Sequence, residues 1–218
     1  MAKTRLTRIQ EFIRLPALAL AFVWLLGTGP LPAVSAFMEA YAKIDSYVAD
    51  VTMHETNGNA VQDRTYRYSY LKPHFAKAEV TSGPGKGGGV VWRGGDTLKG
   101  HQGGFFSRIK VEMSIHDRRA VSLRGDTIEF GSIESVVADL KAPNQTESSG
   151  TVDAQPVAIV TISYAQPENG VVKEAIAFSK TTHLPIRRTQ YGPGDAVLKQ
   201  VDIRSLDSSV KLTEADFN

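Results

Sequence analysis

The chain has 218 residues, with 25 Lys and Arg against 23 Asp and Glu, and it contains no cysteine. This length suits one domain, or one large and one small domain, and a hydrophobic fraction of 42% argues against disorder as the main state. The absence of cysteine from the sequence excludes a disulfide scaffold, a thiolate zinc site, an iron–sulfur cluster, a cysteine nucleophile and a lipid-modified cysteine.

The first 36 residues have the three-part pattern of a secretory signal peptide. Four basic residues precede an apolar run from Ala17 to Leu26, and Val34-Ser35-Ala36 then places small or modest side chains before a cleavage point. A membrane anchor is the alternative, but it needs about 20 apolar residues and this run is shorter. We therefore expect cleavage after Ala36 and a mature domain over residues 37–218. Its 21 basic and 22 acidic groups leave a net charge of −1 and no electrostatic footprint for nucleic acid.

The mature chain opens with a helical pattern and continues as strands. Apolar spacing predicts a short amphipathic helix over Phe37–Val48. From Ser46 the period changes to two, and the turn at Asn57-Gly58-Asn59 predicts a hairpin into a strand that carries three tyrosines. Glycine turns then separate further strands, which we expect at Phe75–Thr81, Val90–Trp92, Thr97–His101 and Ile109–Ile115.

A second helix interrupts the strands at Ser132–Lys141, where apolar residues recur at i, i+3, i+4 and i+7 and Gly131 or Ser132 can cap the first turn. The pattern therefore predicts an α+β domain with a single antiparallel sheet of nine or ten strands and two helices. Two short helices cover one apolar sheet face incompletely, so we expect a strongly curved sheet with an apolar gap beside the helices. The later strands are expected at Pro156–Tyr164, Val171–Phe178, Pro185–Tyr191 and Ala196–Leu206.

The sequence contains no local catalytic or metal-binding motif. Its five histidines are widely separated, and no G-x-S-x-G elbow is present. The Gly83–Gly89 run lacks the Lys-Ser or Lys-Thr pair of a phosphate-binding loop. For the carboxylate pairs Asp63 with Glu55 and Glu129 with Glu134, a solvated strand or helix face is the better interpretation. We expect no enzyme, no metal and no cofactor.

Three alternating tyrosines are the most suggestive feature of the mature chain. They share one face of a strand, and two larger aromatic residues follow nearby. Two interpretations are open: cross-strand packing in the core, or the wall of a ligand cavity, to which Met53 would add an adaptable side chain. The residues expected to line such an apolar cavity are Tyr66, Tyr68, Tyr70, Phe75, Trp92, Met113, Val136 and Leu140.

The C-terminal segment carries the most specific motif. His183-Leu184-Pro185 begins a predicted strand, and Leu212–Phe217 has the form L-T-x-x-D-F. With Tyr70-Leu71-Lys72-Pro73 and the hairpin at Val91-Trp92, this layout resembles the LolA-like superfamily of exported proteins of Gram-negative bacteria. The resemblance implies an incomplete β-barrel with helices over its concave face, a periplasmic location and a cavity for acyl chains. The missing cysteine argues against the lipidated LolB type.

We therefore expect a non-catalytic periplasmic carrier or binding protein, a monomer, that holds a lipid or the acyl chains of a lipoprotein between sheet and helices. A membrane protein of the envelope is a possible second partner, and nucleic acid is not expected as one. Two alternatives stay open. The first is an envelope regulatory or assembly module, as in RseB-type relatives, that binds a protein through its sheet edge or helices. The second is a hydrolase whose site is assembled from distant residues.

Overall fold

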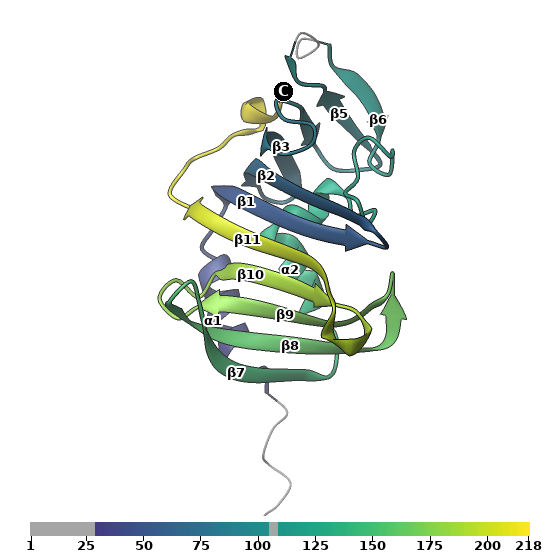
Figure 1. Ribbon diagram of the computed structural model, residues 1–218. Helices are drawn as coiled ribbons and strands as arrows, with labels where there is room; N and C mark the ends of the chain where they lie inside the picture. Colours follow the sequence, from purple (N-terminus) through teal and green to yellow (C-terminus); the bar gives the residue numbers. More distant parts are fainter. Residues whose placement is uncertain (1–28, 105–108) are drawn as a thin grey trace, which may run out of the picture. The chain divides into compact units, whose positions relative to one another are not determined.

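A single antiparallel sheet of eleven strands organises the chain from Leu31 to Asn218 (Figure 1). The computed structural model describes residues 29–104 and 109–218. Most of the predicted signal peptide lies outside the described residues. The strand order is β6-β5-β4-β3-β2-β1-β11-β10-β9-β8-β7. Strands β6 and β7 lie at opposite ends of this order, so the sheet is open.

Most neighbouring strands are consecutive in sequence, and a long connection that contains the second helix joins β6 to β7. Strands β1 and β2 form a long hairpin, and the strands on either side of this pair continue the sheet in two directions. The helices are α1 (Pro32–Tyr41) and α2 (Ile133–Asp139), with one-turn 3-10 helices at Ile128–Gly131, Pro193–Asp195 and Glu214–Phe217. The strands are β1 Ser46–Asn57, β2 Ala60–Leu71, β3 Phe75–Ser82, β4 Gly89–Trp92, β5 Thr97–His101, β6 Val111–Ser114, β7 Gln145–Val152, β8 Gln155–Glu168, β9 Val171–Ser179, β10 Pro185–Tyr191 and β11 Val197–Asp207.

This architecture confirms the predicted α+β class with one open antiparallel sheet and two helices. The predicted strand number was too low because β7 went unrecognised. Its sequence, Gln145–Val152, is polar and mostly exposed, as an edge strand can be. The first helix was also misplaced. It begins at Pro32, since proline is favoured in the first turn of a helix, and it ends at Tyr41, before β1 starts.

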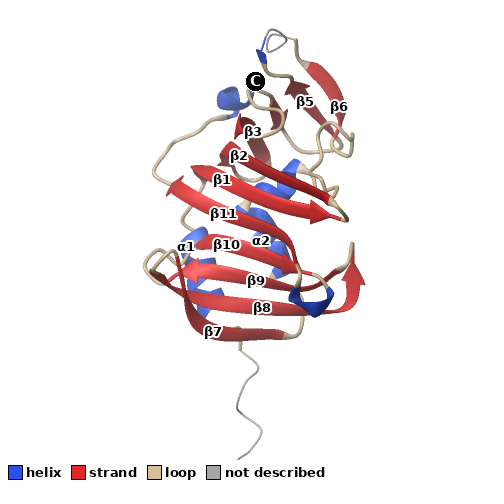
Figure 2. Cartoon of the chain, viewed as in Figure 1, coloured by secondary structure: helices blue, strands red, loops and turns tan. Residues whose placement is uncertain are grey.

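Both helices pack against the same face of the sheet, which we call the interior face (Figure 2). On α1, the centroid of the Phe37 ring lies 5.1 Å from that of the Phe178 ring of β9. At the start of α2, the Ile133 N–H donates to the Tyr47 hydroxyl of β1 at 2.9 Å. Tyr47 stands opposite Tyr70 in the β1–β2 register, so the tyrosines of β2 belong to this face. That the helices cover a concave face of the sheet stays a prediction.

Helix α1 runs across the predicted cleavage point. Ala33 and Val34 are buried, and the Ala33 N–H donates to Glu147 Oε2 at 3.0 Å. Cleavage after Ala36 would remove the first half of this helix and leave Phe37 at the new N-terminus. The cleavage itself stays a prediction. None of the helices in the described part of the chain is long and apolar enough to cross a membrane.

We predict that Phe37→Ala lowers the free energy of unfolding by about 3–5 kcal/mol, because it removes a fully buried ring and leaves a cavity between α1 and β9. Urea denaturation followed by circular dichroism measures the loss. Met38→Ala, in the same helix but 43% exposed, is the control and should change stability by about 0.5 kcal/mol or less. Equal effects of the two variants would contradict this packing of α1.

Candidate functional site

A cavity of about 670 Å³ lies on the interior face of strands β1 to β4. Residues 115–132 join β6 to α2, and we call them the connecting segment; several of them line the cavity on the other side. This volume is within the range of small-molecule sites, about 300–1,000 Å³. The strand residues that line it are Val51, Met53, Arg64, Tyr66, Tyr68, Ala78, Val80, Gly89, Val90 and, on β5, His101, and those of the connecting segment are Arg119, Ala120, Val121, Ser122, Asp126, Thr127, Ile128 and Gly131.

Two of the predicted aromatic residues stand in the cavity wall. Burial raises the pKa of the Tyr66 phenol, and it raises that of Tyr68 well above its ordinary value. Both rings therefore stay neutral and present mainly apolar surface. The Tyr68 hydroxyl donates to the Ile128 carbonyl of the connecting segment at 3.0 Å, so this ring also joins the two sides of the cavity.

Glycines allow two loops to meet at the edge of the cavity. Residues 84–86 and 88 and residues 102–104 contribute to its lining. A Cβ on Gly103 would lie 2.3 Å from the Lys86 carbonyl oxygen, so a side chain at this position would force the loops apart. Gly87 has a φ of +81°, which a side chain rarely adopts, and it faces Gly103. The glycine run of the sequence thus serves close packing between loops, and β4 follows it.

A smaller cavity of about 270 Å³ adjoins the first. The two share Gly89, Val90, His101, Gln102 and Arg119 in their walls, and Met113 of β6 lines the smaller one. The structure therefore brings three of the eight predicted cavity residues, Tyr66, Tyr68 and Met113, to these two neighbouring spaces.

The other five predicted residues do not line these two cavities: four of them lie in the packed core, and Phe75 packs against Phe217, with ring centroids 5.8 Å apart, outside that core. Tyr70 stacks on Tyr47 with ring centroids 5.5 Å apart, and the Trp92 Nε1–H donates to the Gly95 carbonyl at 2.9 Å. These contacts match the alternative interpretation of the stripe, cross-strand packing. The remaining three are Phe75, Val136 and Leu140, all buried. Ligand contact by any of the eight stays a prediction.

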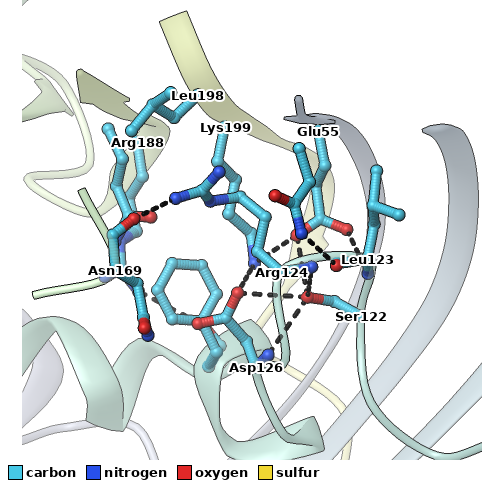
Figure 3. Close-up of polar contacts among 12 residues, drawn as sticks. Glu55, Ser122, Leu123, Arg124, Asp126, Asn169, Arg188, Leu198 and Lys199 are labelled. Carbon is cyan, nitrogen blue, oxygen red and sulfur yellow. Dashed lines mark hydrogen bonds and ion pairs between the residues drawn. The ribbon is translucent and has the colours of Figure 1, made fainter. Parts of the chain in front are cut away.

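Beside the cavity, a buried cation on β11 ties the connecting segment to the sheet (Figure 3). Lys199 is 1% exposed, and its Nζ lies 2.9 Å from Oε1 of Glu55, which is also 1% exposed. The same ammonium group pairs with Asp126 of the connecting segment. The Ser122 hydroxyl donates to Glu55 at 2.8 Å, and the Leu123 N–H donates to it at 3.1 Å.

A second buried cation, Arg188 on β10, binds α2 and the residue Phe130 that precedes it. Its Nε donates to Glu174 of β9 at 2.7 Å, and its Nη2 donates to Asp139 of α2 at 2.6 Å. Its Nη1 reaches the Phe130 carbonyl at 3.2 Å. The Phe130 ring lies against both cations: its centroid is 4.0 Å from the Arg188 guanidinium carbon and 3.9 Å from Lys199 Nζ. Such contacts add cation–π attraction to the ion pairs.

The sequence interpretation missed these charges, and for Glu55 it was wrong. Glu55 is buried beside Lys199, whereas Asp63 lies on the opposite face and pairs with His54 at 2.8 Å. The two carboxylates therefore share no pocket. The sequence did contain an indication that Glu55 is buried. It lies two and four residues after Met53 and Val51, so it shares their face of the strand, and that face is the interior one.

The described residues hold no cluster of three or more His, Cys, Asp or Glu placed to bind a metal ion. His101 lines both cavities, His54 lies on the outer face of the sheet, and His74 stacks on Phe75. The cavity offers apolar contact, neutral phenol rings, the cationic side chains Arg64, Lys86 and Arg119, and the polar side chains His101, Gln102, Ser122, Asp126 and Thr127.

No protein-family model matches the sequence, and neither does any curated protein. Solved structures are similar in fold. An uncharacterised conserved protein from Thermus thermophilus has a TM-score of 0.54 at 10% identity, over 85% of this chain and 90% of that one. A LolA superfamily protein from Nitrosomonas europaea has 0.40 at 9%, over 86% and 98%. The Mycobacterium tuberculosis lipoprotein LppX has 0.46 at 13%, over 83% and 96%.

At these identities the similarity concerns the fold alone. The open antiparallel sheet with two helices is the architecture that the predicted LolA-like resemblance implies, and it confirms that prediction at the level of the fold. The fold identifies no ligand for this chain.

We predict that Lys199→Met lowers the free energy of unfolding by about 3–5 kcal/mol, because it leaves Glu55 buried without its cation. Chemical denaturation at pH 7 measures the loss. Lys173→Met, which breaks an ion pair with the exposed Asp195, is the matched control and should cost about 1 kcal/mol or less. The proposed role of Lys199 would be contradicted if the two variants were equally stable.

Asp139 should make stability depend on pH. Burial raises the pKa of its carboxyl to about 6; Arg188 opposes this rise and Glu174 adds to it. The folded state therefore binds more protons than the unfolded state between the ordinary value of 3.8 and about 6. The contribution of Asp139 to the free energy of unfolding must then fall as the pH rises through this window.

Comparison of the wild type with Asp139→Asn isolates this effect. We expect the free energy of unfolding of the wild type minus that of the variant to fall between about pH 4 and pH 6 and to be flat above about pH 6.5. Urea denaturation at half-unit pH steps measures the difference. A difference that increases with pH across the window would contradict a raised pKa of Asp139.

Proposed function

We propose that this protein is a non-catalytic carrier or binding protein for a lipid, or for the acyl chain of a lipoprotein, and that the chain lies in the cavity under the connecting segment. One observation carries the proposal: the cavity of about 670 Å³ whose sheet wall includes the apolar side chains of Val51, Met53, Tyr66, Val80 and Val90. This part of the wall removes hydrocarbon from water, and the polar side chains of the lining are left for the polar end of a ligand.

Methylene burial gives such a site both affinity and reversibility. Each buried methylene contributes about 0.8 kcal/mol, so one long chain binds without any covalent step. The connecting segment would act as the cover that opens for transfer, and curvature of the sheet would make room between sheet and helices. Aromatic and methionine side chains at the wall suit chains of different shape, because methionine adapts to irregular surfaces.

We propose further that the chain is exported to the periplasm after cleavage near Ala36 and acts there as a monomer. Removal of residues 1–36 would shorten α1, but Phe37, its fully buried anchor, would remain. Transfer to or from a membrane protein of the envelope would then use the exposed ends of the sheet.

A second candidate function, an envelope module that binds a protein partner, is favoured by the sheet edge at β6. This strand is terminal in the sheet, and Ile109 and Val111 beside or within it are 57% and 41% exposed. An edge strand with exposed apolar side chains can accept a strand from another protein. Binding of an apolar ligand separates the two candidates, because this one needs no ligand in the cavity.

We predict that Val80→Trp weakens binding of the apolar fluorophore N-phenyl-1-naphthylamine by about tenfold or more, because the indole fills space in the cavity. Fluorescence titration of the purified protein measures the affinity. Val61→Trp, on β2 but 61% exposed, is the control and should bind as the wild type does. Thermal unfolding of both variants checks their folding.

Two results would count against the carrier. Absence of fluorophore binding to the wild type, after delipidation, would remove the proposed function and leave the partner-binding module. Wild-type affinity in a folded Val80→Trp variant would place the apolar ligand elsewhere in the molecule.

A further inference from the structure

Arg64 of β2 stands in the wall of the cavity without a counter-ion. It faces the interior, opposite Met53 in the β1–β2 register, and it lines the cavity. Among the described residues, no carboxylate lies within 4.0 Å of its guanidinium group. Its Nε is buried and has no hydrogen-bond partner. Its Nη1 donates to the Tyr66 hydroxyl at 3.5 Å, the outer limit for a hydrogen bond.

The other two interior cations of the sheet are paired on both sides. Lys199 has Glu55 and Asp126, and Arg188 has Glu174 and Asp139. Burial of a charged donor without an acceptor is unfavourable, so interior guanidinium groups are normally satisfied in this way. Arg64 as a whole is only partly buried, but its Nε is buried at the wall of the cavity without an acceptor, and a molecule bound in the cavity would supply that acceptor.

The register places Arg64 at a boundary on the interior face. Toward one end of the strands lie apolar pairs, with Tyr66 opposite Val51 and Tyr68 opposite Ala49. Toward the other end, the next row of residues that pair across the strands is polar. Its members are Gln62 of β2, Glu55 of β1, Lys199 of β11, Gln190 of β10 and Glu174 of β9. Arg64 therefore stands where the apolar part of the wall ends.

The charges around the cavity have an excess of positive sign. Besides Arg64, the lining includes Lys86 and Arg119, while its carboxylate is Asp126. Asp126 is paired with Lys199, and Arg119 with Asp117 at 2.8 Å. For Arg64 and Lys86, no carboxylate partner is present among the described residues.

We propose that Arg64 binds the anionic headgroup of an amphiphile whose chain occupies the cavity. This inference rests on the proposed function and names the class of its ligand. A carboxylate and a phosphate monoester both accept the paired N–H groups of a guanidinium, so either headgroup fits this chemistry. The chain would lie along Tyr66, Tyr68 and Val80, and the headgroup would lie at the boundary of the polar row.

Competition for N-phenyl-1-naphthylamine tests the inference with three single-chain ligands of equal length: palmitate, hexadecyl phosphate and hexadecanol. For the wild type, at least one anion should displace the fluorophore at about tenfold lower concentration than the alcohol, since a hydrogen bond to a charged group contributes about 1.5–3 kcal/mol. The stronger of the two anions identifies the headgroup. Arg64→Met should abolish the preference and leave displacement by hexadecanol unchanged.

Arg67→Met is the matched control, because Arg67 is on the same strand, faces outward and pairs with Asp50 at 3.2 Å. It should keep the wild-type preference. Arg64→Lys retains the charge, so it should keep part of the preference and also serves if Arg64→Met does not fold. Equal displacement by all three ligands, or a preference that survives in a folded Arg64 variant without charge, would overturn the inference and leave the carrier intact. Failure of every ligand and of the fluorophore would instead remove the proposed function.

Discussion

Lys199 and Arg188 stand on a sheet face that is otherwise mostly apolar, and each one has a carboxylate partner from the sheet and another from the residues that lie over it. Unpaired charges at these depths would be strongly unfavourable. The two ion networks therefore fix the connecting segment and α2 over β1 and β9 to β11. The cavity lies over β2 to β4, where the hydrogen bond from Tyr68 to Ile128 joins the sheet to the connecting segment.

The alternation of β1 explains how one strand serves both the cavity and its cover. Every second residue from Tyr47 faces the interior, and the series is apolar until it reaches Glu55. The same change from apolar to polar occurs on β11 between Val201 and Lys199, which pair with Met53 and Glu55 of β1. A face with an apolar and a polar end is suited to a molecule with the same division, a hydrocarbon chain with a charged headgroup.

Much of this fold was predictable from the sequence, because period-two alternation and glycine turns mark strands directly. Strand β7 was missed because it has few apolar residues, and α1 was misplaced because Pro32 begins it within the predicted signal peptide. The cavity was predicted only in outline. Which tyrosines face it depends on where the connecting segment crosses the sheet, and that is fixed by ion pairs such as Lys199–Asp126, between residues far apart in sequence.

The central claim is that an apolar chain occupies the space between the β2–β3 face and the connecting segment. A crystal structure of the protein with a fatty acid brominated at its terminal carbon tests this most directly, since anomalous scattering locates the bromine. The account predicts the bromine inside the cavity, among Tyr68, Ala78 and Ile128, at the end of the apolar wall away from Arg64. A fatty acid bound on the outer face of the sheet, with this cavity free of it, would contradict the account.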